Sequence, residues 1–137
     1  MDGLSIPPTS VTRLLRLDGL AVGVAAIAAY AVIGGNWWLF AALILAPDLS
    51  FLALGLGPRR AAQIYNIAHS YALPVVLGGI GHFAGIDSMV AISLIWAAHI
   101  GIDRAVGYGL KYPAAPDHTH LGLIGKARKA ARLADPG

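Results

Sequence analysis

The chain contains no cysteine and no glutamate, and charge of either sign is scarce along it. The absence of cysteine excludes disulfides, thiolate metal ligands and cysteine nucleophiles. Charged residues make up only 12% of the chain, which is about half the share found in a typical soluble domain. Apolar residues make up 57%, so too few polar side chains remain to cover a globule in water. The composition therefore excludes a soluble protein and indicates a membrane protein.

Four apolar stretches occupy most of the sequence, at about 14–33, 37–56, 61–83 and 88–110. Each has about 20 residues, the length with which a helix crosses a bilayer core of ~30 Å. Apolar side chains lie on nearly every face of these stretches, and no run alternates with the period of two that indicates a strand. We expect an all-α protein: an antiparallel bundle of four transmembrane helices with short loops over residues 1–113. A polar, basic tail follows over residues 114–137, with a helix-prone part from 125 to 133.

The basic residues lie on one side of this predicted bundle. Nine of the ten lie at the start of the first stretch, between the second and third, or after the fourth, and the tenth is Arg104. Because basic segments stay on the inner side, we predict a multi-pass membrane protein with both termini cytoplasmic. An uncleaved first helix fits this charge pattern better than a cleaved signal peptide. Attraction to anionic lipid explains the basic tail, and no nucleic acid is expected as a partner.

Several ionisable side chains fall at one depth inside the predicted spans, where such groups are usually paired or functional. Counted from the cytoplasmic boundary, Asp48, His69, His99 and Asp103 lie roughly 10–17 Å deep at about 1.5 Å per residue. His99 and Asp103 are four residues apart and share one helix face. Two imidazoles and two carboxylates suit a divalent zinc, iron or manganese ion. These four residues are therefore the candidate metal ligands.

Further polar residues near this layer are candidates for supporting the site or contacting a substrate: Asn66, Ser70, Arg104, Tyr108, Lys111, His118 and His120. Arg104 has three candidate roles, which are to extend to the cytoplasmic surface, to pair with Asp48, or to hold an anionic substrate. Pro74 predicts a kink just beyond the polar layer.

Three functions remain open from the residues alone. The first is an intramembrane metal enzyme that hydrolyses a lipid or another amphiphile near the inner leaflet. The second is a non-enzymatic bundle whose polar layer joins the helices by hydrogen bonds or binds a partner. The third is a small proton or ion carrier, which would need a homo-oligomer because four spans are few for transport.

Five segments carry a resemblance to a known family, at residues 37–40, 46–50, 65–71, 99–104 and 107–113. Together they resemble domain-of-unknown-function family 4260, a family of small bacterial membrane proteins. The resemblance extends from about residue 13 to residue 122. It implies a four-helix membrane protein of the bacterial inner membrane and brings no known activity.

A second resemblance rests on the order of shorter motifs. Pro47-Asp48, His69-Ser70, the spacing from His99 to Asp103, and Tyr108-Gly109 are similar in order to the motifs of the membrane-bound metal-dependent hydrolases. This resemblance implies that Asp48, His69, His99 and Asp103 hold a metal. Where that family has a second aspartate and the first histidine of its central motif, this chain has Ser50 and Ile64.

Overall fold

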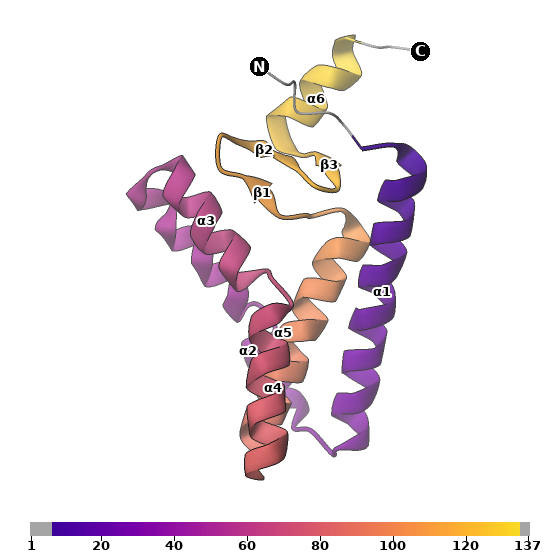
Figure 1. Cartoon of the computed structure of the whole chain (residues 1–137), viewed down its shortest axis with the longest axis vertical. Coiled ribbons are helices and arrows are strands. Elements are labelled where there is room, and N and C mark those ends of the chain that lie inside the picture. The colour runs from indigo at the N-terminus through magenta and orange to yellow at the C-terminus, as the bar shows by residue number, and fades with distance from the viewer. Residues whose placement is uncertain (1–6, 135–137) are drawn as a thin grey trace.

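Helices dominate the computed structural model of the protein, which describes residues 7–134 (Figure 1). Four helical stretches are long and apolar enough to cross a membrane, namely Thr9–Val32, Trp37–Leu56, Pro58–Ala84 and Asp87–Val106. They coincide closely with the four predicted spans, and the all-α prediction is confirmed. The first stretch is α1 (Thr9–Val32) and the last is α5 (Asp87–Val106), which ends four residues earlier than predicted because Gly107 adopts a left-handed conformation with φ of +104°.

The second and third stretches are each interrupted near their middle. The second begins as α2 (Trp37–Leu43) and continues as a 3₁₀ helix, η1 (Ala46–Leu56). The third consists of α3 (Pro58–Ala68) and α4 (Ala72–Ala84). The predicted kink at Pro74 is wrong in position, since the helix breaks before it, at residues 69–71. Pro74 instead lies in the first turn of α4, where its missing N–H leaves no helical bond unmade.

Helix α5 is the central element, with α1 packed along one side and α4 along another (Figure 1). The contact with α1 depends on glycine. A Cβ atom at Gly101 would lie only 2.6 Å from the Cα atom of Gly23, so the two backbones touch. Gly81 of α4 allows a similarly close approach to Met89 of α5. Small residues at such crossings are typical of helices that associate within membranes.

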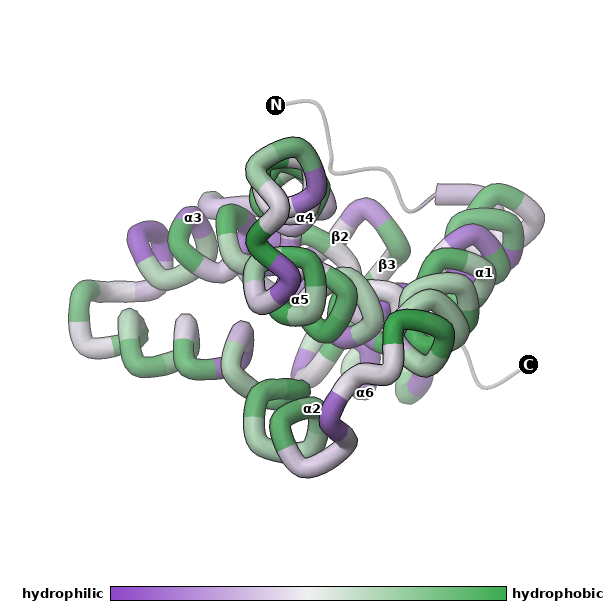
Figure 2. Tube along the Cα trace, turned by 90° about the horizontal axis from the view of Figure 1, so that it is seen from below, coloured by the Kyte–Doolittle hydropathy of each residue, from purple (hydrophilic) through white to green (hydrophobic). Residues whose placement is uncertain are grey.

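Helices η1 and α3 form a hairpin that leans away from the other helices (Figure 1). Side chains three residues apart eclipse in a 3₁₀ helix, so Asp48, Phe51 and Leu54 share one face. On that face Phe51 packs against Tyr65 of α3, with ring centroids 5.6 Å apart. The same face turns Asp48 toward α3. All residues of the fully described stretch 37–56 stay at least partly exposed, and Figure 2 shows that hydrophobic residues make up much of the length of the helices.

A small antiparallel sheet follows α5, and the sequence pattern does not predict it. It consists of β1 (Lys111–Tyr112), β2 (Ala115–Thr119) and β3 (Gly122–Leu123) in the order β1-β2-β3. Helix α6 (Gly125–Ala134) comes next and matches the predicted helix of the tail. Asn66 of α3 anchors the sheet, because its side-chain amide donates to the Lys111 carbonyl and accepts from the Lys111 N–H, both at 2.7 Å.

The segments that carry basic residues lie at one end of the molecule. The start of α1, the turn between η1 and α3, the sheet and α6 all lie at the upper end in Figure 1. The turns that follow α1 and α4 lie at the lower end. The sheet therefore lies over the same end of α5 that carries Asp103 and Arg104.

Candidate metal centre

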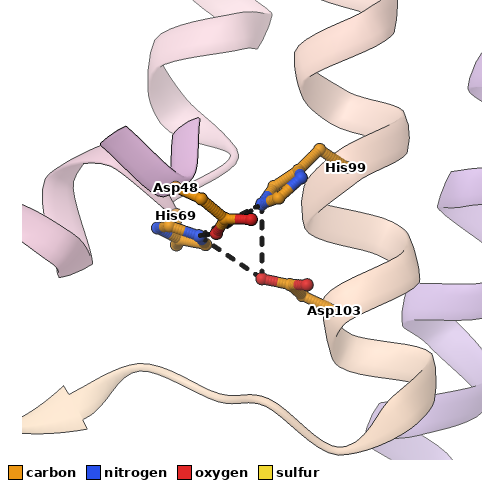
Figure 3. A group of neighbouring side chains, drawn as sticks. All are labelled: Asp48, His69, His99 and Asp103. Carbon is orange, nitrogen blue, oxygen red and sulfur yellow. Dashed lines mark hydrogen bonds and ion pairs between the residues drawn. The ribbon is translucent and has the colours of Figure 1, made fainter. Parts of the chain in front are cut away.

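The four candidate ligands converge on one point, although they come from three separate elements. Figure 3 shows Asp48 and His69 on one side and His99 and Asp103, both from α5, on the other. The two Nε2 atoms of His69 and His99 lie 3.2 Å apart. Each Nε2 atom lies 3.3–3.4 Å from an oxygen of Asp48 and an oxygen of Asp103. One ligand atom from each residue lies within 4.8 Å of all the others.

His69 reaches this point because it sits in the interruption between α3 and α4. Two carbonyl groups that a continuous helix would bond internally are free there, and side chains of α5 satisfy them. The Trp96 indole N–H donates to the Ala68 carbonyl at 2.7 Å. The Arg104 guanidinium donates to the His69 carbonyl, also at 2.7 Å. The interruption is thus fastened to the helix that carries the other two ligands.

A hydrogen bond determines which nitrogen of the neutral His69 ring carries the proton. Its Nδ1 atom lies 2.9 Å from the Tyr65 carbonyl oxygen. Because a carbonyl can only accept, Nδ1 carries the proton, and the Nε2 atom of the neutral ring presents a lone pair to the cluster. A histidine that binds a metal through one ring nitrogen typically donates the N–H of its other ring nitrogen to a carbonyl or carboxylate in this way. The Tyr65 ring also stacks on the His69 ring, with centroids 3.8 Å apart.

A shared proton or cation would stabilise the atoms that face one another in the cluster. A bare Nε2 lone pair faces carboxylate oxygens at 3.3–3.4 Å, and such electron-rich atoms repel one another unless a cation or a proton lies between them. Ligands bound tetrahedrally at about 2.0–2.2 Å are separated by about 3.3–3.6 Å. The distances between the imidazole nitrogens and the carboxylate oxygens match that spacing. The donor set fits zinc, iron or manganese.

The centre is closed on the histidine side and open at Asp48. The side chain of His69 is fully buried, whereas the side chain of Asp48 is 37% exposed and that of Asp103 is 19% exposed. A small molecule can therefore approach the cluster past Asp48.

Arg104 neither extends to the surface nor pairs with Asp48, which were two of its three candidate roles. Its side chain is buried, and its guanidinium donates to the carbonyl groups of His69 and Tyr108 at 2.7 and 2.9 Å. Tyr108 follows the end of α5, so one guanidinium joins the interruption in the third span to the chain that leads into the sheet. Arg104 is a positioning residue for His69.

The other predicted supporting residues lie around the centre rather than in it. The Ser70 hydroxyl accepts from the Ala72 N–H at 3.3 Å and so helps to begin α4. The Lys111 ammonium lies over the rings of Tyr65 and Phe51, at 4.3 and 4.8 Å from their centroids, and burial lowers its pKa. The side chain of Tyr108 is half exposed. His118 and His120 belong to the sheet region and lie outside the four-residue cluster.

His120 supports the sheet in a way that depends on pH. Its Nδ1 atom accepts from the Leu110 N–H at 2.9 Å, and burial, with the nearby Arg104 charge, lowers its pKa below the ordinary 6.5. The stabilisation is therefore complete above about pH 6.5 and is lost as the pH falls through the lowered pKa. We expect the Leu110 amide to exchange faster at pH 5 than its intrinsic rate predicts. The variant His120→Asn keeps an acceptor at this position, and an equal pH dependence in that variant would contradict the assignment.

Two residues close to the ligands along the chain were not among the predicted site residues. Tyr65 precedes His69 by four residues on α3, a spacing that places its ring and its carbonyl against the imidazole. Ser50 follows Asp48 by two residues, and its hydroxyl is buried without a partner among the described residues. The i to i+4 spacing is a signal that could have found Tyr65. No spacing rule identifies Ser50, because its surroundings depend on the 3₁₀ geometry of η1.

Comparison with known proteins gives one match. Neither the curated proteins nor the solved structures contain a match to this chain. The family described as "Domain of unknown function (DUF4260)" matches residues 12–124, which include all four residues of the cluster and the whole of the sheet. The chain therefore belongs to the DUF4260 family.

Proposed function

We propose that this protein is a membrane-embedded, metal-dependent hydrolase that acts on a lipid or another amphiphile. One observation carries the proposal: the Nε2 lone pair of His69, fixed by the bond to the Tyr65 carbonyl, faces two carboxylates and a second imidazole. A divalent ion held by Asp48, His69, His99 and Asp103 supplies Lewis-acid activation of water at neutral pH.

The residues of the chain divide the remaining work among them. His69 and His99 are buried and hold their rings in fixed orientations, which keeps water away from the closed side of the centre. Asp48 directs Oδ1 toward both imidazoles and lies at the open side, where it is placed to accept a proton from an attacking water. Arg104 holds the His69 backbone, and the partly buried Lys111 lies above the hairpin, where it would meet an anionic head group.

The proposed location follows from the basic residues and the four membrane-crossing stretches. We propose a multi-pass protein of a bacterial inner membrane with both termini in the cytoplasm. The cluster then lies in the cytoplasmic half of the bilayer, within reach of lipid head groups of the inner leaflet. The substrate comes from the bilayer, and the site is complete within one chain.

Metal content and hydrolysis test the proposal together. We expect protein purified in lipid nanodiscs with added zinc, iron or manganese to retain about one equivalent of one of them, as a folded metal centre does. We expect it to hydrolyse single-chain ester substrates, and we expect stripping with a chelator to abolish the activity and metal to restore it. A metal content below about a tenth of an equivalent would rule out a resident ion. Hydrolysis that survives complete stripping would rule out the metal dependence.

A second candidate function rests on the same cluster. The 3.2 Å separation of the two imidazole nitrogens also suits a proton shared between His69 and His99, with the carboxylates balancing its charge. That arrangement would make the protein a proton carrier or a structural bundle. Metal-free protein that conducts protons in vesicles, and loses conduction in His99→Gln, would favour the carrier over the hydrolase.

A further inference from the structure

A second feature beside the cluster is a hollow lined almost entirely by apolar side chains. Its volume is about 290 Å³, near the lower end of the usual range for ligand pockets. The hollow lies between the second span, the end of α3 and α5, and its apolar wall includes Leu43, Ala46, Pro47, Ala68, Ile92 and Ile95. Pro47 and Ala68 directly precede two of the cluster residues, so the hollow adjoins the centre.

Only two side chains of the lining carry polar atoms, and one of them is already bonded. The Trp96 indole N–H donates to the Ala68 carbonyl. The Ser50 hydroxyl is buried and has no partner within residues 7–134. An unpaired buried hydroxyl is costly, and Ser50 lines the apolar hollow two residues after Asp48. The wall therefore offers one hydrogen bond beside a surface suited to hydrocarbon.

We propose that this hollow binds the hydrocarbon chain of a single-chain ester, whose carbonyl oxygen accepts a hydrogen bond from Ser50. The inference deepens the proposed function, because it places the ester group beside the cluster and the chain in the apolar space. A hydrocarbon chain fits the apolar lining, since contact between two apolar surfaces leaves no polar group unpaired. An ester carbonyl fits Ser50, since it accepts without needing a donor in return.

Photolabelling in nanodiscs tests this assignment without relying on activity. The probe is a long-chain alkyl ester with a diazirine on the chain, and its matched partner is the ether that lacks the carbonyl. We expect labelling to concentrate on Ile92, Ile95 and Trp96. Ala46→Phe fills the hollow and should lower labelling roughly tenfold, as changes in a tight apolar pocket do. Ala42→Phe, an exposed position of the same span that does not line the hollow, should leave labelling unchanged.

The role of Ser50 has its own control. Ser50→Ala should lower labelling by the ester about fivefold, the value of one hydrogen bond, to the level of the ether. Each measurement is made with metal bound and after chelation, so the chain site can stand even if the centre holds no ion. Labels spread evenly over lipid-facing residues such as Val75 and Val76, insensitive to Ala46→Phe, would overturn the proposal. Equal ester and ether labelling in the unsubstituted protein would overturn the part played by Ser50.

Discussion

Replacing His69 with alanine should remove the metal from the centre entirely. His69 lies fully buried between both carboxylates and His99, so its loss leaves three ligands around a gap that no other side chain fills. We expect the metal content of the purified variant to fall from about one equivalent to less than about a tenth, with loss of any ester hydrolysis. Elemental analysis of protein in nanodiscs gives the answer directly.

Two further variants make this result specific. His82→Ala removes an exposed histidine near the end of α4, and it should keep the full metal content. Asp103→Asn preserves the shape of a ligand while removing its charge, so it should weaken metal binding without loss of the fold. A His69→Ala protein that keeps its metal would show that the ion, if present, lies elsewhere. A loss of metal in His82→Ala as well would indicate general unfolding rather than a lost ligand.

Replacing Arg104 with methionine should displace His69, although Arg104 bonds the His69 backbone and none of the four cluster side chains. The change removes both charged hydrogen bonds that Arg104 gives to the His69 and Tyr108 carbonyls. The bond to the His69 carbonyl is buried and the bond to the Tyr108 carbonyl is partly buried, and we expect a loss of about 3 kcal/mol in unfolding free energy. We expect metal affinity to fall by about 10–100-fold, the usual effect of losing a group that orients a ligand.

Arg16→Met is the matched control for this prediction. Arg16 also donates to a carbonyl of α5, that of Ala105 at 2.8 Å, but it is exposed and does not contact the interruption at His69. We expect Arg16→Met to leave metal affinity unchanged and to alter stability by less than about 1 kcal/mol. Equal losses of metal affinity in the two variants would mean that Arg104 acts only through overall stability. Metal titration and thermal unfolding, measured on the same samples, separate the two effects.

The sequence predicts the spans because their signal is local. About 20 consecutive apolar residues specify a membrane helix whatever the neighbouring helices do. The convergence of the cluster was also foreseeable, because helix geometry and the basic loops give each ionisable residue a depth. Depth alone leaves the rotation of each helix undetermined. That rotation brings Asp48 and His69 onto the face of α5 that carries His99 and Asp103.

The features that sequence reasoning missed depend on partners distant along the chain. The break at residues 69–71 persists because Trp96 and Arg104, about 30 residues later, bond its carbonyls. Strands β1 and β3 have two residues each, and the Asn66 side chain of α3 hydrogen-bonds the Lys111 backbone at the edge strand β1. The 3₁₀ form of η1 is unusually long for that conformation, and no local rule predicts it. These are tertiary effects that override local preference.

The hairpin of η1 and α3 leans away from α5. It nevertheless carries Asp48, and His69 follows its end, so both side chains reach the two candidate ligands on α5. Ion binding at the proposed centre would consequently be linked to the tilt of this hairpin, since a tilt that separates the two halves pulls the donor atoms apart. The tilt of a membrane helix responds to the thickness of the surrounding hydrocarbon, at fractions of a kcal/mol per Å. By reciprocity, a bilayer that favours the closed tilt also raises affinity for the ion. In the metal-bound protein proposed above, the thickness of the surrounding lipid would therefore change the affinity for the ion.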